Sequence, residues 1–257
     1  MIIRERSEEI VMIGQHEHGQ LSGHFADRWQ TDDLAGSPRE AVVFAAYEHD
    51  RCWLDLDDIP IWNDADEAPY SFIDYPIRPK LLAYGKGIDE IRQRNGYSGL
   101  LASLHFSALL EPFNHPAISA YLAERRLWEQ RWKAELGLID DDKLQELDRH
   151  LRILQFCDHL SLYMCMNEPG ADKSEEMPWY ISGIPESSLL PPSGGKTIVA
   201  RWLDASAIAV GPFPFQAPFR IELRGKTVAK ADIKRRGLVH AYESAALQTW
   251  PIDILPG

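Results

Sequence analysis

The stretch "AVVFAAYEHDRCW", residues 41–53, decides how we interpret this chain. Its first half is apolar and rich in alanine, as in a buried helix, and it ends in two adjacent polar residues, His49 and Asp50. A buried carboxylate is costly unless a cation neutralises it, so an aspartate at the end of such a helix needs a positive partner. We therefore interpret His49 and Asp50 as metal ligands.

The composition limits the classes of function. The chain has 257 residues, enough for one large domain or for a domain with a smaller appendage. Its formal net charge of -12 argues against nucleic acid and against an anionic membrane as partners, but leaves a small anionic substrate open. The three cysteines form no CxxC pair, and we recognise no signal peptide or membrane-spanning segment. These features predict a cytoplasmic protein, and they leave homo-oligomerisation open.

Several segments in the first two thirds of the chain have helical patterns. One begins at "SPRE", where Ser37 is the expected N-cap and Glu40 completes a capping box, and it carries His49 at its far end. The others are residues 15–29, 97–110, 117–136 and 141–166. The intervening residues 51–96 contain four prolines among acids and aromatics, and so long an irregular segment is more often functional than idle.

The ends of the chain have a strand-like character. Residues 1–14 fit a small hairpin, and residues 196–233 alternate between apolar and polar side chains after a stretch rich in proline, glycine and serine. We predict a mainly α fold, a helical bundle with a small C-terminal antiparallel β appendage. The expected domains are a helical metal-binding domain at 1–167 and a proline-rich linker with a β-rich region at 168–257, packed on the first.

Polar residues interrupt three more apolar helix faces. Residues three, four, seven and eight apart share a face of a helix, and by this rule His18 and His105 each fall on an apolar stripe. In the helix at 141–166, Asp158 stands where the stripe would have a leucine. Together with His49 and Asp50, these side chains would converge from four helices.

Three imidazoles and two carboxylates suit one or two ions of a divalent transition metal: iron, manganese, nickel or zinc. The absence of thiolates argues against a closed structural zinc site. The alternative for each residue is structural. A single inward histidine is more often a hydrogen-bonded core residue than a ligand, and Asp158 could instead pair with Arg51 or Arg125.

The order His18, His49-Asp50, His105 and Asp158 resembles the HD-domain superfamily, whose second helix ends in His-Asp as "FAAYEHD" does here. The resemblance covers residues 15–166. It implies a helical core with a mononuclear or dinuclear metal centre, most often in a phosphohydrolase. The four shared ligands would be His18, His49, Asp50 and Asp158, and His105 would match one of two histidines added in dinuclear members.

The chain departs from that superfamily in two places. No histidine lies between Asp50 and His105, so a second-metal ligand has no counterpart. The residues after His-Asp are "RCW" rather than a small residue, glycine and lysine, so Arg51 would have to replace a phosphate contact. The segments "QHEHGQLSG", "EHDRCW", "SFIDYP", "CDHLSLYMC" and "GPFPF" also resemble an uncharacterised bacterial family of unknown function over nearly the whole chain.

The leading hypothesis is metal-assisted hydrolysis of a small, anionic molecule, with a physiological substrate that the sequence leaves unknown. The metal would lower the pKa of a bound water, Asp50 would be a ligand that also orients this water, and Glu48 is a candidate base. The residues expected to contact the substrate are Arg51, Trp53, Tyr70 and Asp74.

Two hypotheses from other classes stay open. A di-iron oxygenase of the inositol-oxygenase type would need a sixth ligand, for which His150 or a residue of 51–96 is a candidate. A non-catalytic, metal-dependent sensor or binding protein would use the C-terminal sheet as its partner surface. An exposed apolar patch around Phe213 and Phe215 would favour the sensor.

Overall fold

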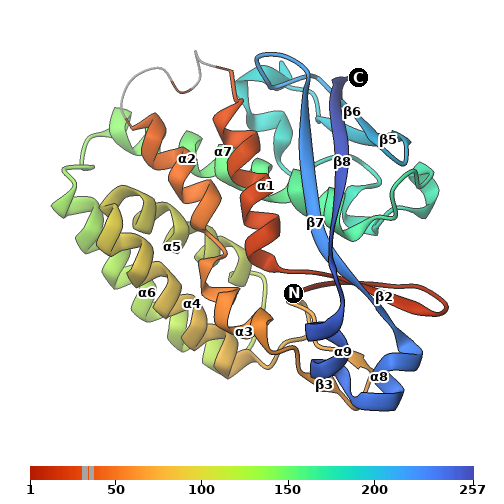
Figure 1. Cartoon of the computed structure of the whole chain (residues 1–257). Helices are drawn as coiled ribbons and strands as arrows, with labels where there is room; N and C mark the ends of the chain where they lie inside the picture. The colour runs from red at the N-terminus through yellow and green to blue at the C-terminus, as the bar shows by residue number, and fades with distance from the viewer. Residues whose placement is uncertain (31–33, 35–37) are drawn as a thin grey trace.

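The computed structural model describes residues 1–30, 34 and 38–257 (Figure 1). The helices of the first two thirds are α1 (Gln15–Asp27), α2 (Arg39–Glu48), α3 (Leu54–Asp58), α4 (Ile77–Arg94), α5 (Gly96–Leu110), α6 (Pro116–Glu135) and α7 (Asp141–Met166). Two short helices follow near the C-terminus, α8 (Lys230–Arg236) and α9 (Leu238–Ser244). The strands are β1 (Ile2–Glu5), β2 (Glu9–Ile13), β3 (Trp62–Asn63), β4 (Ala68–Pro69), β5 (Val199–Asp204), β6 (Ala207–Gly211), β7 (Phe219–Ala229) and β8 (Leu247–Pro256).

Helices α1 and α7 lie between a sheet and an outer group of helices. Figure 1 shows the long strands β7 and β8 on one side of α1, with α2, α4, α5 and α6 on the other. Helix α1 contacts α2, α7 and β7, and α7 also contacts α5 and β1. Because both helices have neighbours on opposite sides, polar side chains that they carry can be deeply buried.

The main sheet joins the two ends of the chain. Its strand order is β1-β2-β7-β8-β6-β5, so the N-terminal hairpin pairs with the C-terminal strands. All neighbours are antiparallel except β6 and β8, which are parallel. Strand β8 therefore follows the other strands in the sequence but lies between β7 and β6 in the sheet. A second sheet contains only β3 and β4.

The prediction of a mainly α, HD-like helical bundle with a small antiparallel β appendage is wrong, because the six-stranded sheet is a major layer of the fold. Strand β8 was not predicted, because its segment "LQTWPIDILP" contains Pro251. A proline is tolerated in a strand where its missing N–H faces no partner. Strand β6 pairs only with residues 253–256 of β8, so Pro251 lies beyond that pairing.

The helix predictions had mixed outcomes. The helix at 141–166 is confirmed with the same bounds, and those at 97–110, 117–136 and 15–29 are confirmed to within two residues at each end. The segment 51–96 was wrongly expected to be irregular, because it contains the whole of α4. Pro79 falls in the first turn of α4, where no backbone N–H is needed. The expected N-cap at Ser37 lies outside the described residues.

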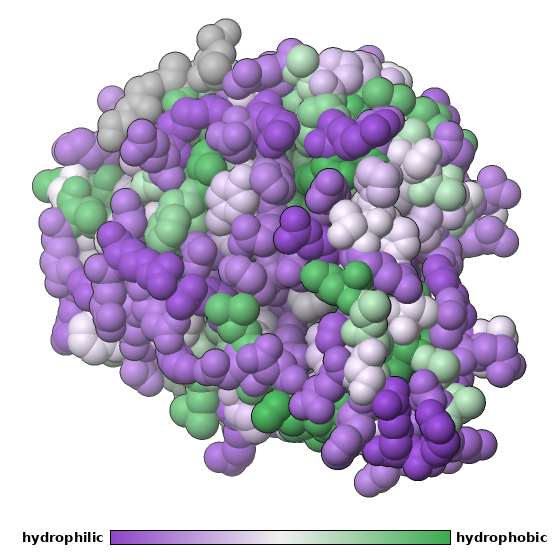
Figure 2. Space-filling view, in the orientation of Figure 1, coloured by the Kyte–Doolittle hydropathy of each residue, from purple (hydrophilic) through white to green (hydrophobic). Residues whose placement is uncertain are grey.

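One hydrophobic core extends across the expected domain boundary. Side chains on both sides of residue 167 pack together, among them Phe25, Trp29 and Phe156 before it and Phe215 and Ile254 after it. The division into 1–167 and 168–257 stays a prediction. On the face seen in Figure 2, hydrophilic residues predominate and apolar ones form small scattered patches. Many of the large apolar side chains, such as Trp29, Trp53 and Tyr163, are fully buried.

Candidate metal centre

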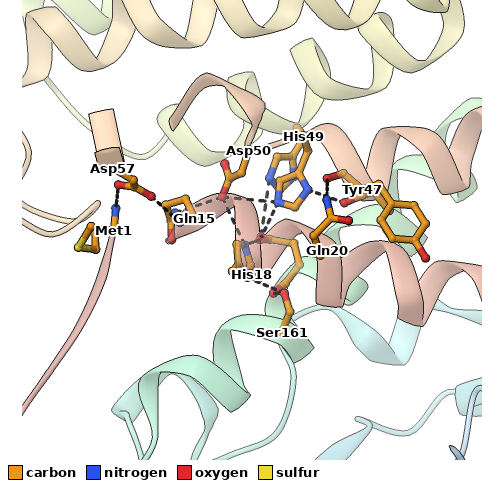
Figure 3. Close-up of polar contacts among 12 residues, drawn as sticks. Met1, Gln15, His18, Gln20, Tyr47, His49, Asp50, Asp57 and Ser161 are labelled. Atoms are coloured by element: carbon orange, nitrogen blue, oxygen red, sulfur yellow. Dashed lines mark hydrogen bonds and ion pairs between the residues drawn. The ribbon is translucent and has the colours of Figure 1, made fainter. Parts of the chain in front are cut away.

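Four helical segments bring five polar side chains together between the layers. His18 comes from α1, His49 and Asp50 follow the last turn of α2, His105 comes from α5 and Asp158 from α7. Figure 3 shows His18, His49 and Asp50 directed toward one another. All five residues are buried, with exposed fractions of 0% for His18 and His49, 1% for His105, 3% for Asp158 and 5% for Asp50.

Two glycines on α1 allow the close approach of α1 to α2. A Cβ added to Gly19 would lie 3.1 Å from the Tyr47 carbonyl oxygen, and one added to Gly23 would lie 2.1 Å from the Tyr47 ring. A larger residue at Gly23 would therefore push the helices apart. Because α1 lies this close to the last turn of α2, His18 of α1 lies beside His49 and Asp50.

The imidazole and carboxylate atoms are within the range expected for ligands of a shared ion. The Nε2 atom of His18 lies 2.9 Å from Asp158 Oδ1 and 3.4 Å from Asp50 Oδ2. The Nε2 atom of His49 lies 3.3 and 3.7 Å from the same two oxygens. On the other side of the cluster, His105 Nε2 lies 3.7 Å from Asp158 Oδ2. These groups could hold a metal ion as two sets of three donors, each set within 4.8 Å: His18, His49 and Asp50, and His49, His105 and Asp158.

The hydrogen bonds on the far side of two rings determine which nitrogen carries a proton. Ser161 Oγ lies 2.8 Å from the Asp158 carbonyl oxygen and 2.6 Å from His18 Nδ1, and when it donates its one proton to the carbonyl oxygen it accepts from Nδ1. His49 Nδ1 likewise donates to the Ala46 carbonyl oxygen at 2.8 Å. In both neutral rings the Nε2 lone pair then faces carboxylate oxygens. Two facing lone pairs repel, so either a proton or a metal cation must lie between them.

The electrostatics of the cluster indicate the same need for positive charge. Burial lowers the pKa of His18, but the neighbouring carboxylates of Asp158 and Asp50 outweigh burial and raise it well above its usual value. Burial raises the pKa of Asp158, yet the histidines around it hold this pKa well below the usual range. His105 differs, because burial lowers its pKa to about 4 and leaves it neutral, the form that binds metals.

Ser161 was missed by the sequence reasoning, and it gives a prediction. Ser161→Ala removes the hydrogen-bond partner of the His18 ring, so we expect metal affinity to fall about 10- to 100-fold, as it does when other residues that orient a metal-binding histidine are removed. Isothermal titration with a divalent metal measures this. Ser98→Ala is the matched control, because Ser98 is equally buried and donates to the Ala41 carbonyl oxygen away from the cluster. Equal metal affinity in Ser161→Ala and wild type would contradict the orienting role.

Gln15 is a second residue that sequence reasoning missed. Its Nε2 donates to Asp50 Oδ2 at 3.1 Å, and its backbone N–H donates to Asp57 Oδ2 at 2.6 Å. Figure 3 shows this chain of contacts running from Asp57 through Gln15 to Asp50. Little in the sequence could have identified Gln15. It precedes the apolar stripe of α1, and its polar side chain was the only indication.

The residues expected to contact a substrate lie in other surroundings. Arg51 donates to Glu90 at 2.7 Å and to Glu48 at 3.0 Å, so the candidate base Glu48 is held in an ion pair. Trp53 is buried against tyrosine rings, and Tyr70 packs near Tyr75. Asp74 accepts bonds from Ser71 and Asn63 and so stabilises its own turn. The roles of Glu48, Arg51, Trp53, Tyr70 and Asp74 in catalysis or binding stay predictions.

The alternative partners considered for Asp158 are engaged elsewhere. Arg51 pairs with Glu48 and Glu90, and the ion pair formed by Arg125 is with Glu124. His150, the candidate sixth ligand, bonds instead to the Tyr97 hydroxyl at 2.8 Å. Among the described residues, the side chains within 4 Å of the Asp158 carboxylate that can carry a positive charge are histidines.

A cavity of about 210 Å³ adjoins the cluster. His105 lines it, together with residues from the next turns of α5 and α7 and from the segment 185–190. His159, which follows Asp158, lines the same cavity and lies within 3.3 Å of the Tyr180 hydroxyl. Of the five residues of the cluster, His105 is the one that lines this cavity.

Residues 1–230 match the family model described as "Protein of unknown function (DUF3891)", so the chain belongs to that family. No curated protein and no solved structure matches it. The resemblance to the HD-domain superfamily is wrong: the family match names no HD domain, and the sheet departs from a helical bundle. A His-Asp pair that closes an apolar helix was too short a motif to establish that superfamily.

Along the described residues, no helix combines the length and the apolar character needed to cross a membrane. The cytoplasmic location stays a prediction.

Proposed function

We propose that this member of the family is a metal-dependent hydrolase, with a divalent transition metal held by His18, His49, Asp50, His105 and Asp158. One observation carries the proposal. The Nδ1 atoms of His18 and His49 bond to Ser161 and to the Ala46 carbonyl oxygen, and their Nε2 atoms lie 2.9 and 3.3 Å from Asp158 Oδ1, so these buried groups need a cation between them, a proton or a metal ion. Three of the donors, His18, His49 and Asp50, lie within 4.8 Å of one another and could hold that metal ion.

The donor set favours a single ion. The Nδ1 atom of His49 is used by the Ala46 carbonyl oxygen, so this ring offers only its Nε2 lone pair. Both sets of three donors include His49. Since one lone pair binds one ion, the two sets compete for His49, and a di-iron oxygenase would lack a complete second set of donors.

Hydrolysis is the chemistry that fits this centre and its surroundings. A divalent metal with nitrogen and oxygen ligands lowers the pKa of a water molecule and polarises an ester or phosphoryl oxygen. Asp50, held by Gln15, would help to orient that water, and the cavity beside His105 would admit a small molecule. The sensor hypothesis has less support, because Phe215 is buried against Phe25 and Trp29 and leaves no exposed patch of its own.

Metal content and turnover test the proposal separately. Purified protein should contain about one ion of iron, manganese, nickel or zinc per chain. It should hydrolyse 4-nitrophenyl phosphate or 4-nitrophenyl acetate, lose this activity with a chelator and regain it with the metal.

His150→Gln is the control, because His150 is a buried histidine of α7 outside the cluster, and this variant should keep both metal and turnover. Metal without hydrolysis of either ester would end the hydrolase proposal and leave the centre. A wild-type protein that binds none of these metals would end both.

A further inference from the structure

The cavity beside His105 has one cationic side chain at its mouth, Arg152 of α7. Arg152 is 29% exposed, whereas His105 at the other end of the cavity is 1% exposed. Leu109 and Phe156 line the cavity with them. The cavity therefore combines a buried metal-ligand candidate, walls that are partly apolar and a guanidinium that is partly exposed to solvent.

Two carboxylates hold Arg152 in unequal ways. Asp148, one turn earlier on α7, accepts from its Nε atom at 2.7 Å and fixes the direction of the side chain. Glu186 accepts from Nη1 at a longer 3.3 Å, and the Glu186 side chain is 70% exposed. An ion pair this exposed contributes little to stability, so another anion can replace Glu186 at low cost.

We infer that Arg152 binds a terminal carboxylate or phosphate of the substrate, which displaces Glu186 from Nη1, while the reacting group of the same molecule lies at His105. This inference rests on the proposed function, because it uses the metal centre as the reacting end. It assigns the substrate to a chemical class: a short, elongated molecule with an anionic tail and an apolar middle that contacts Leu109 and Phe156.

The helix sets the separation between the two ends. Arg152 and His159 are seven residues apart on α7, which corresponds to about 10 Å along the helix axis. The Arg152 side chain reaches back along α7 to Asp148, so its guanidinium is at least this far from the level of Asp158. A substrate too short to span it could reach only one end.

A pair of phosphonates tests the inference without turnover. A phosphonate group has anionic oxygens that seek the metal, and 6-phosphonohexanoate carries a terminal carboxylate that hexylphosphonate lacks. Isothermal titration of the metal-loaded protein should show 6-phosphonohexanoate binding about tenfold more tightly, since a charge-assisted bond to arginine forms only with this ligand.

Three variants identify the residue responsible. The preference for the carboxylate should vanish in Arg152→Gln, persist in Arg149→Gln and grow several-fold in Glu186→Gln, where the competing anion is removed. Arg149 is the matched control because it is an exposed arginine of the same helix outside the cavity. A preference that is absent in wild type, or that survives in Arg152→Gln, would overturn the inference.

The two proposals fail in different ways. Metal content is measured on the same samples, and ester hydrolysis is assayed separately. An Arg152-dependent preference in a protein that binds no metal or hydrolyses no ester would support the anion site and end the hydrolase proposal. Metal-dependent hydrolysis without that preference would support the hydrolase proposal and end the inference about Arg152.

Discussion

Asp158→Asn is expected to deprive the protein of its metal. The Asp158 carboxylate lies within 4 Å of the Nε2 atoms of His18, His49 and His105, so it is the one group that contacts all three imidazoles. Replacing it by an amide removes a charge and presents a weaker donor to the ion. We expect metal affinity to fall about 100-fold or more, a larger loss than removal of a residue that only orients a ligand. Elemental analysis and competition with a chromogenic chelator measure the loss.

Glu129→Gln is the control for this charge removal. Glu129 is also a buried carboxylate, and it accepts bonds from Ser103 and Ser107 on α5. This variant should keep its metal, although its stability falls. If Asp158→Asn bound metal as tightly as wild type, the cluster would be a set of core ion pairs and no metal centre.

Ile254→Ala should lower the free energy of unfolding by about 2–5 kcal/mol, the usual cost of truncating a large side chain in a core. Ile254 is fully buried on β8, where it is opposite Phe219 of β7 and Ile208 of β6. The alanine would leave a cavity in the part of the sheet where three strands meet. Urea denaturation followed by circular dichroism measures the change.

Leu247→Ala is the matched substitution on the same strand. Leu247 is 58% exposed at the start of β8, so its truncation should change the free energy of unfolding by no more than about 0.5 kcal/mol. Equal losses at both positions would mean that β8 is not inserted in the sheet as described.

Helical periodicity was sufficient to identify the residues of the candidate site. His18, His105 and Asp158 are each a polar residue on an otherwise apolar face, and faces of this kind turn inward wherever helices pack. His49 and Asp50 could be added because they end such a helix. The structure brings all five together, and their roles as ligands stay a prediction.

The neighbours of the site could not be found in the same way. The contact from Ser161 to His18 depends on a hydroxyl direction that periodicity does not specify. The cavity needs residues 185–190, which come from a segment without regular structure. Strand β8 was missed because Pro251 masks its alternation, and α4 because prolines at its start resembled those of a loop.

The position of β8 has a consequence for how the protein is made in the cell. A ribosome delivers β6 and β7 before residues 247–256, so these two strands emerge without the one that must lie between them. Until it arrives, the nascent chain exposes unpaired edges that chaperones recognise and that promote misassembly. Helix α1 carries His18 and packs on β7, so we expect its final packing to follow the strand pairing that residues 247–256 complete.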